Sequence, residues 1–319
     1  MSLYDVTGLG EVMLRLSVPA GSHLETARQL DVHPGGAEAN TLVALARLGY
    51  RTAWCSGLPV GATGRLVANH LRQAGVDLSC MVWSDEGRTG LYFLENAEPP
   101  RNVDVIYDRA ASCASRLRPD QVNWDRLMDT SIFHISGITP AVSPSCLDVT
   151  RTALAEARAR GVMVSFDLNF RSKLWTAAEA RTTLQPMLSM ADILFCGQAD
   201  AETVLGLQGA PEAQLEALAD LAAGDTVVMS CGTEATYVRH AGVVFRRDVV
   251  PVQVVDRLGA GDALAAGVLH GLLNQDVEMG LRFGSVMAAM TLTQHGDMLV
   301  THRAEVEQLV ASGGGALQR

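Results

Sequence analysis

Short apolar runs alternate along the chain with longer stretches in which apolar residues recur every three or four positions. The short runs are typical of buried strands and cover residues 6–9, 52–56, 132–135, 162–166, 193–195 and 227–229. The longer stretches predict helices and cover residues 39–48, 65–74, 145–160, 211–222 and 261–273. Strands that alternate with helices favour a parallel sheet with helices on both faces. The sequence therefore predicts an α/β fold with a doubly wound, mostly parallel sheet.

Glycine follows three of the predicted helices, at Gly49, Gly75 and Gly161. A helix commonly ends on a residue in the left-handed conformation, which glycine adopts without steric cost. We therefore expect these three glycines to end their helices with positive φ angles.

Two segments depart from the alternation of strands and helices. Residues 12–33 and 88–113 lack helical periodicity, and the second contains alternating runs at 89–94 and 103–107. Both segments are therefore expected to be extended, and together they predict a small β-sheet that lies over the main domain as a lid. The remaining residues, 1–11, 34–87 and 114–319, would form the main α/β domain.

Composition and charge exclude several classes of protein. Of 319 residues, 48% are hydrophobic and 19% charged, which is too apolar for a disordered chain. The formal net charge of −10 argues against a nucleic-acid partner. No apolar run is long enough for a membrane span and no secretory signal is recognised, so we expect no membrane partner. The six cysteines form no C-x-x-C pair, which favours free thiols and a cytoplasmic location.

Lys173 is the one lysine among the 25 basic residues. A Walker A loop and a protein kinase each require a lysine in a specific context, and a Schiff-base enzyme requires an amine nucleophile. The sequence around Lys173, Asn-Phe-Arg-Ser-Lys, fits neither of the first two. These nucleotide-binding motifs are therefore excluded.

The strongest chemical signal is a turn of small residues that opens a helix near the C-terminus. Residues 254–267 read VVDRLGAGDALAAG. Gly259, Ala260 and Gly261 allow backbone N–H groups to approach a ligand, and a helix N-terminus favours an anion such as phosphate. Asp262 would lie beside that phosphate. The alternative is that Asp262 only caps the helix.

With Gly35, Gly36 and Asn40 at the start of the first long helix, this chain resembles the ribokinase-like (pfkB) carbohydrate kinases from Gly8 to about Glu305. The two signatures that carry the resemblance are Gly-Gly-x-x-x-Asn and Asp-x-x-Gly-Ala-Gly-Asp. The resemblance implies that the turn of Gly259, Ala260 and Gly261 is an anion hole for the transferred phosphoryl group, with Asp262 as the catalytic base. It also implies that Gly35, Gly36 and Asn40 line the sugar site.

Within this family, the chain is most similar to the 2-keto-3-deoxygluconate kinases. The similarity lies in residues 35–40, 89–92, 107–109 and, above all, 167–175, which read DLNFRSKLW. It implies that five residues contact a sugar acid, namely Tyr92, Tyr107, Arg109, Asn169 and Arg171. A planar guanidinium matches a carboxylate, and such charge-assisted hydrogen bonds contribute about 1.5 to 3 kcal/mol each.

The resemblance also implies ATP and Mg²⁺. Asn169 and Asp200 would lie near the Mg²⁺, holding it through water, although residues 196–200 depart from the family's usual Asn-x-x-Glu. The adenosine half of ATP is expected near four residues, Ser230, Gly232, Ser285 and His295. Whether a monovalent cation is also required is left open.

The resulting hypothesis is ATP-dependent phosphorylation of the terminal hydroxyl of 2-keto-3-deoxygluconate. Asp262 would orient that hydroxyl and accept its proton late, for which an ordinary aspartate pKa suffices. The lid would exclude water, and its exposed edges favour a homodimer or higher homo-oligomer.

Three alternatives are open: a kinase for a neutral sugar such as fructose or ribose, a catalytically weak protein that binds sugar acids, and a Rossmann dehydrogenase. Gly8-Leu9-Gly10 suggests the last, but lacks the third glycine of that motif.

Overall fold

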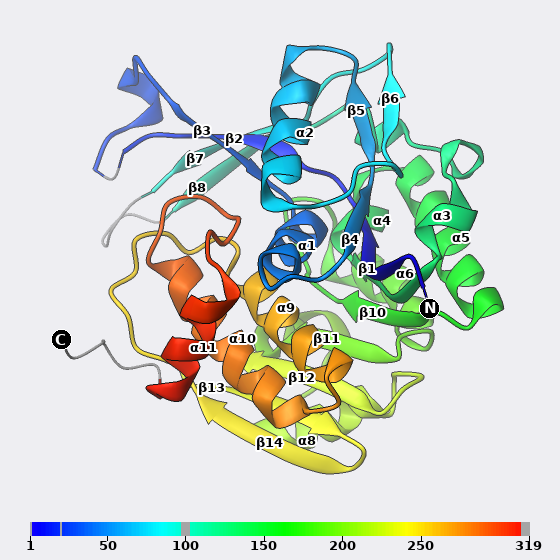
Figure 1. The fold of residues 1–319 in the computed structure, drawn as a ribbon, viewed down its shortest axis with the longest axis vertical. Helices are drawn as coiled ribbons and strands as arrows, with labels where there is room; N and C mark the ends of the chain where they lie inside the picture. The colour runs from blue at the N-terminus through cyan, green and yellow to red at the C-terminus, as the bar shows by residue number, and fades with distance from the viewer. Residues whose placement is uncertain (1, 20, 97–102, 314–319) are drawn as a thin grey trace.

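The computed structural model describes residues 2–19, 21–96 and 103–313 (Figure 1). Among these residues, eight strands form the main sheet in the order β14-β13-β12-β11-β10-β9-β1-β4. The neighbours from β12 to β4 are parallel, whereas β13 and β14 are antiparallel. The strand bounds are β1 Tyr4–Leu9, β4 Thr52–Cys55, β9 Thr130–Ser136, β10 Met163–Asp167, β11 Ile193–Gly197, β12 Thr226–Cys231, β13 Ala235–His240 and β14 Val243–Asp248. The predicted fold class is confirmed.

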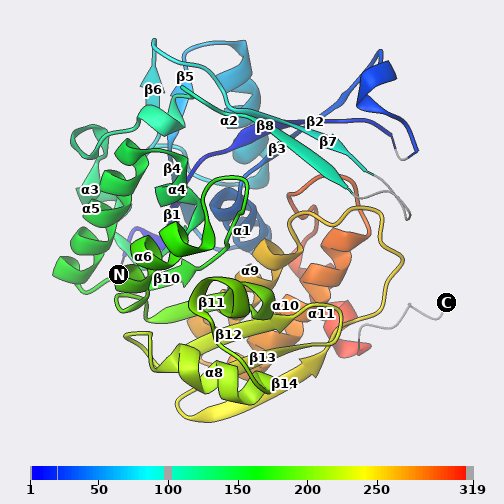
Figure 2. The same ribbon diagram turned by 180° about the vertical axis from the view of Figure 1, so that it is seen from behind.

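Helices cover both faces of the main sheet. One face carries α1 (Ala37–Arg47), α2 (Ala62–Ala74), α9 (Ala260–Leu273), α10 (Val277–Leu292) and α11 (Arg303–Ala311). The opposite face, which Figure 2 shows in front, carries α5 (Pro144–Arg160), α6 (Ala177–Leu188) and α8 (Pro211–Ala219). Shorter helices are α3 (Trp124–Leu127), α4 (Ile138–Val142) and α7 (Gln198–Asp200), followed by a π-helical turn at Ala201–Leu205. Three 3₁₀ turns lie at Leu24–Thr26, Ala114–Arg116 and Pro119–Gln121.

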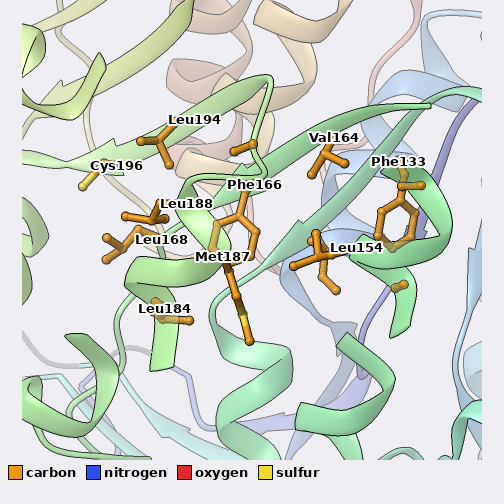
Figure 3. Packing of buried hydrophobic residues seen from close by; sticks show 14 of the residues in the cluster. Phe133, Leu154, Val164, Phe166, Leu168, Leu184, Met187, Leu188, Leu194 and Cys196 are labelled. Atoms are coloured by element: carbon orange, nitrogen blue, oxygen red, sulfur yellow. The ribbon is translucent and has the colours of Figure 1, made fainter. Parts of the chain in front are cut away.

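The sheet separates two hydrophobic cores. In the core on the side of α5 and α6, Phe133 and Phe166 from the sheet pack beside Leu154 and Met187 (Figure 3). Phe133, Phe166 and Leu154 are no more than 1% exposed, and burial of such side chains supplies about 1.5 to 3 kcal/mol each. No described helix is long and apolar enough to cross a membrane. All six cysteines are free and buried.

A second sheet of four described strands projects from the main domain (Figures 1 and 2). Its order is β3-β2-β7-β8, with β2 at Met13–Ser17, β3 at Asp31–Gly35, β7 at Leu91–Glu95 and β8 at Asp104–Asp108. The segments 12–33 and 88–113 supply nearly all of these strands, with residues 20 and 97–102 outside the described part. We call this sheet the lid. A separate pair joins β5 (Gly57–Pro59) to β6 (Val82–Ser84).

Helix ends follow local rules that the sequence predicts. Ser143 caps α5 by accepting a hydrogen bond from the Cys146 N–H at 3.0 Å. Gly49, Gly75 and Gly161 have φ angles of +93°, +98° and +67°. The left-handed conformation expected at these three glycines is confirmed.

Helices α9 and α10 pack with their backbones in contact, because glycines face each other where they meet. A Cβ on Gly267 would lie 2.1 Å from the backbone nitrogen of Gly284, and one on Gly271 would lie 2.4 Å from the Cα of Gly280. Real Cβ atoms do not approach backbone this closely, so larger residues would force the helices apart. The contact holds α9 firmly against the core.

We expect Gly267→Ala to lower the free energy of unfolding by about 1 to 3 kcal/mol, because it overpacks the contact between α9 and α10. The measurement is urea-induced unfolding followed by circular dichroism. Gly61→Ala is the matched control, since nothing lies within 4 Å of a Cβ there. It should change stability by less than about 0.5 kcal/mol. Equal effects of the two substitutions would contradict the prediction.

Candidate active site

A cavity of about 540 Å³ lies between the lid and the carboxyl ends of β1, β9 and β10. Ligands of open α/β sheets bind at this edge. We call it the central cavity. Its lining residues are Glu11, Met13, Gly35, Gly36, Ala37, Glu38, Asn40, Tyr92, Val105, Tyr107, Arg109, Ile138, Phe170, Arg171, Ser172, Lys173, Arg257, Leu258, Gly259, Asp262 and Asp297. Nine of the predicted site residues are among them, namely Gly35, Gly36, Asn40, Tyr92, Tyr107, Arg109, Arg171, Gly259 and Asp262.

The turn before α9 depends on a glycine. Gly259 has a φ angle of +84°, and a Cβ on it would lie 2.0 Å from the main-chain oxygen of Asp297. Helix α9 begins at the next residue and runs for 14 residues, so its N-terminus carries a partial positive charge. Ala260 and Gly261 do not line the central cavity, and a Cβ on Gly261 would find nothing within 4 Å.

Asp262, in the first turn of α9, faces the central cavity. The Asn40 side-chain amide donates to its Oδ2 at 2.6 Å, and the Thr41 hydroxyl donates to its main-chain oxygen at 3.2 Å. Burial raises the pKa of Asp262 to about 8, the hydrogen bond from Asn40 and the charge of Arg171 lower it, and Asp167 raises it. The sequence did not show how enclosed this carboxyl is, so the rise in its pKa was not predicted.

The early glycines allow close contacts where β3 leads into α1. A Cβ on Gly35 would lie 2.6 Å from the Asp297 carboxylate, and one on Gly36 would lie 2.2 Å from the Glu11 carbonyl oxygen. The Gly36 N–H donates to Asn40 Oδ1 at 3.2 Å. The Asn40 amide is therefore held at both ends, between Gly36 and Asp262.

The lid contributes Tyr92, Tyr107 and Arg109. Tyr92 and Tyr107 are opposite each other on β7 and β8, with ring centroids 6.1 Å apart. The Arg109 guanidinium lies 5.7 Å from the Tyr107 ring centre and donates from Nε to Glu11 Oε2 at 2.7 Å. The charge of Arg109 is thus already paired with a carboxylate whose other oxygen, Oε1, is buried without a partner in the described structure.

Arg171 is exposed at the mouth of the central cavity, on the loop after β10. It donates to the Phe170 carbonyl oxygen at 3.3 Å, and no described carboxylate forms an ion pair with it. Its charge lowers the pKa values of Asp167, Asp200 and Asp262 against the opposing effect of burial. Lys173, on the same loop, donates to Asp104 Oδ1 of the lid at 3.1 Å.

Asn169 and Asp200 lie at the carboxyl ends of β10 and β11. Asn169, with a φ angle of +44°, donates to Asp167 Oδ2 at 3.0 Å, and Asp200 Oδ2 accepts the Phe170 N–H at 3.0 Å. Burial raises the pKa of Asp167 to about 7, and the charge of Asp200 adds to the rise. Among the described residues, no group of three or more Asp, Glu, His or Cys side chains is arranged to hold a metal by itself.

The residues predicted for the adenosine half of ATP lie outside the central cavity. Ser230 is the neighbour of Gly197 across β12 and β11, and Gly232 follows β12 with a φ angle of +55°. Ser285 is buried in α10 and donates to the Leu281 oxygen, whereas His295 is exposed after α10. An apolar cavity of about 170 Å³ lies along α10 and does not include Ser285; it is lined by Val250, Val252, Val286, Ala289, Met290, Thr293 and Leu309.

Glu38 is a functional candidate that the sequence analysis missed. It lines the central cavity, is 2% exposed, and its Oε1 accepts hydrogen bonds from Ser136 and Thr139 at 2.7 and 2.8 Å. A Cβ on Gly10 would lie 2.1 Å from Glu38 Oε2. The glycine that suggested a dinucleotide-binding motif therefore makes room for Glu38.

Arg15 was also missed. It lies on β2 and is 1% exposed, with Nη2 2.5 Å from Asp256 Oδ2 and Nη1 2.9 Å from Asp297 Oδ1. The Tyr92 hydroxyl donates to the second oxygen of Asp297 at 2.5 Å. An arginine between two leucines on an alternating strand was the available signal.

Comparison with known proteins agrees with this geometry. The profile of the pfkB family carbohydrate kinases matches residues 5–303. The 2-dehydro-3-deoxygalactonokinase of Haloferax volcanii is 38% identical over 320 residues, 99% of each chain. The 2-dehydro-3-deoxygluconokinase of Bacillus subtilis is 32% identical over 92% of this chain and 91% of that protein.

A solved structure gives the same result. The crystal structure of 2-dehydro-3-deoxygluconokinase from Thermotoga maritima superimposes with a TM-score of 0.89 and 32% identity, covering 97% of this chain and 98% of that one. Both the match to the family along nearly the whole chain and the identity to its members exceed what a shared fold alone would give. This chain belongs to the pfkB family of carbohydrate kinases.

Proposed function

We propose that the protein uses ATP to phosphorylate the terminal hydroxyl of 2-keto-3-deoxygluconate or of its galactonate epimer. The observation that carries the proposal is the presence of Arg171 and Asp262 in one cavity: a guanidinium free of ion pairs with described carboxylates, and an enclosed carboxyl. The carboxylate of a sugar acid would pair with the guanidinium of Arg171, and its terminal hydroxyl would face the carboxyl of Asp262. The substrates named for the relatives above support the same chemistry.

Asp262 is proposed as the base. Its carboxylate would accept a hydrogen bond from the terminal hydroxyl and take the proton as the phosphoryl group is transferred, a step that requires positioning more than a strong base. Asn40, fixed by Gly36, holds Oδ2 of Asp262 at 2.6 Å. The other oxygen of Asp262 can then face the sugar.

The turn of Gly259, Ala260 and Gly261 would stabilise the transferred phosphoryl group. Its backbone N–H groups lie at the N-terminus of α9, where the helix dipole favours negative charge. Loss of one such donor typically costs on the order of 10² to 10³ in rate. ATP would extend from this turn past Ser230 and Gly232, with its adenine in the apolar cavity along α10. Ser285 and His295, also expected near the adenosine half, are not among the residues that line that cavity.

The sugar acid would be bound by Arg171 through its carboxylate. Arg109 contributes differently, because Glu11 already neutralises it. The guanidinium of Arg109 can still donate hydrogen bonds to the keto acid. The ring of Tyr107 lies beside that guanidinium and covers one side of the site. Gly35, Gly36 and Tyr92 line the same cavity.

Mg²⁺ fits the residues at the ends of β10 and β11. Asp167, Asn169 and Asp200 offer the hard oxygen atoms that Mg²⁺ prefers. Burial raises the pKa of both carboxyls, and a bound cation would favour their ionised forms. Mg²⁺ usually keeps several waters and binds one or two carboxylates plus phosphates, so no complete protein cage is required. When bound, it would neutralise charge on the phosphates of ATP.

Residues 12–33 and 88–113 are proposed to close as a lid over the sugar, and 1–11, 34–87 and 114–319 to form the kinase domain. The free thiols support a cytoplasmic location. The outer face of the lid carries a row of apolar residues, Val32, Leu16, Phe93 and Ile106, that are neighbours across its four strands. Val32 and Ile106 are 46% and 49% exposed, which favours a two-fold symmetric dimer in which two such rows meet.

For substrate choice, we expect turnover of 2-keto-3-deoxygluconate or its epimer, and little of 5-keto-2-deoxygluconate, gluconate, fructose or ribose. Arg171→Ala should lower kcat/KM for the keto acid by about 10- to 200-fold, the loss of one charge-assisted contact. The measurement is ADP release with Mg-ATP. Arg151→Ala, an exposed arginine of α5, is the control. A neutral sugar that is preferred, with no effect of Arg171→Ala, would contradict the proposal.

The pH dependence tests Asp262. Below its pKa the carboxyl is protonated and cannot act as a base, so kcat/KM should rise with pH with a midpoint near 8. Arg171 lowers that pKa, so Arg171→Ala should shift the midpoint to higher pH, whereas Arg151→Ala should not. Profiles are recorded at subsaturating concentrations of both substrates. A midpoint that stays the same in Arg171→Ala would refute this assignment.

The dimer is tested by replacing the apolar row. Ile106→Asp together with Val32→Asp should convert the dimer to a monomer, because each copy would bury two charges against its partner. Light scattering after size exclusion measures the mass. Leu66→Asp, an exposed position of α2 that is 47% exposed, should leave the mass unchanged. A wild-type monomer, or a dimer that survives the double substitution, would exclude this interface.

A further inference from the structure

Three segments that are far apart in the sequence meet at the side chain of Arg15. Arg15 lies on strand β2 of the lid, Asp256 on the segment that leads into the phosphate-binding turn, and Asp297 on the segment after α10. The two ion pairs measure 2.5 and 2.9 Å, and the side chains of the three residues are 1%, 0% and 10% exposed. One buried cation therefore joins the lid to two parts of the main domain.

Both aspartates contact the turn before α9, Asp256 through its carboxylate and Asp297 through its main-chain carbonyl. Asp256 Oδ1 accepts the Leu258 N–H at 3.3 Å, and Oδ2 accepts the Gly296 N–H at 3.2 Å. The main-chain carbonyl of Asp297 packs against the α-carbon of Gly259. The position of the turn thus depends on where Asp256 and Asp297 are held.

A second donor from the lid reaches the cluster formed by Arg15, Asp256 and Asp297. Tyr92 is the neighbour of Arg15 across β7 and β2, and its hydroxyl donates to Asp297 Oδ2 at 2.5 Å. Two adjacent lid strands therefore each provide a donor to Asp297, and Asp297 also lines the central cavity. A displacement of the lid would withdraw both donors together.

The free energy of folding alone does not explain this cluster. Burying three charges costs several kcal/mol per ion, and well-packed apolar side chains often do as well. The Nε of Arg15 is buried without a described partner, which adds to the cost. What such a cluster can supply instead is one defined arrangement of the segments it joins.

We propose that Arg15 is a positioning residue that couples closure of the lid to the alignment of the phosphate-binding turn. The inference rests on the proposed role of that turn in phosphoryl transfer. With Arg15 in place, the turn is aligned when the lid covers the sugar and excludes water. Without it, ATP still binds, but the turn and the lid move independently, so transfer slows and water competes with the sugar hydroxyl.

The kinetic test compares Arg15→Lys with Arg51→Lys. A lysine keeps the positive charge, but it lacks the planar guanidinium group that pairs with the carboxylates of both Asp256 and Asp297. Arg51 makes the matched control, because it donates to both oxygens of Asp5 at the surface. Sugar phosphate and ADP are measured separately at saturating substrates, which gives the number of sugars phosphorylated per ATP consumed.

In Arg15→Lys we expect kcat to fall about 10- to 100-fold, as for a slightly misplaced catalytic group. The KM for the sugar acid should change by less than about threefold. The yield of sugar phosphate per ADP should fall clearly below the wild-type value, and Arg51→Lys should leave all three quantities unchanged. A loss of folded protein alone would scale both products equally and leave the yield intact. An unchanged yield in Arg15→Lys would overturn the coupling.

Hydrogen–deuterium exchange provides a readout that does not need the substrate. In the free wild type, peptides from residues 89–95 of the lid and 256–264 of the turn should exchange slowly, and in Arg15→Lys both should exchange faster. Faster exchange confined to β2 would overturn the inference. If no sugar acid is phosphorylated but the two segments respond together, the proposed substrate fails and the linkage stands.

Discussion

The approach of Gly259 to the main-chain carbonyl of Asp297 is the contact on which the active site depends. It sets where α9 begins, and the start of α9 sets the positions of Asp262 and of the turn proposed to bind phosphate. A side chain of any size at position 259 would move all of them. The glycine contacts between α9 and α10 act in the same way at the other end of the helix, so α9 is held at both ends by close backbone packing.

Much of this fold follows from local patterns in the sequence. The six predicted strands are all present, because buried parallel strands are continuous apolar runs with clear limits. The antiparallel strands β13 and β14 were not predicted. On β14 the polar run Arg246 to Asp248 lies at the edge of the sheet, where one face meets water, and its pattern is weak. Helix α10 was not among the helices predicted from periodicity.

Only the residues of the site that belong to sequence motifs could be predicted. The glycines of the turn before α9 were accessible because close backbone approach demands this residue type, whereas Asn40 and the role of Asp262 were assigned through the resemblance to the pfkB kinases. The ion pairs of Arg109 with Glu11 and of Arg15 with two aspartates could not be predicted from the sequence. Ion pairs between distant segments depend on how the lid folds back over the main sheet. The raised pKa of Asp262 has the same origin, because enclosure is a property of the assembled cavity.

The bridge between Lys173 and Asp104 has a consequence for covalent modification of the protein. The chain has one lysine, and its amine lies at the rim of the central cavity, bonded to the lid. Acylation of that amine would remove its charge and with it the ion pair. Acyl donors that act on lysine side chains therefore have one target in this enzyme, and it is the residue that ties the loop after β10 to the lid.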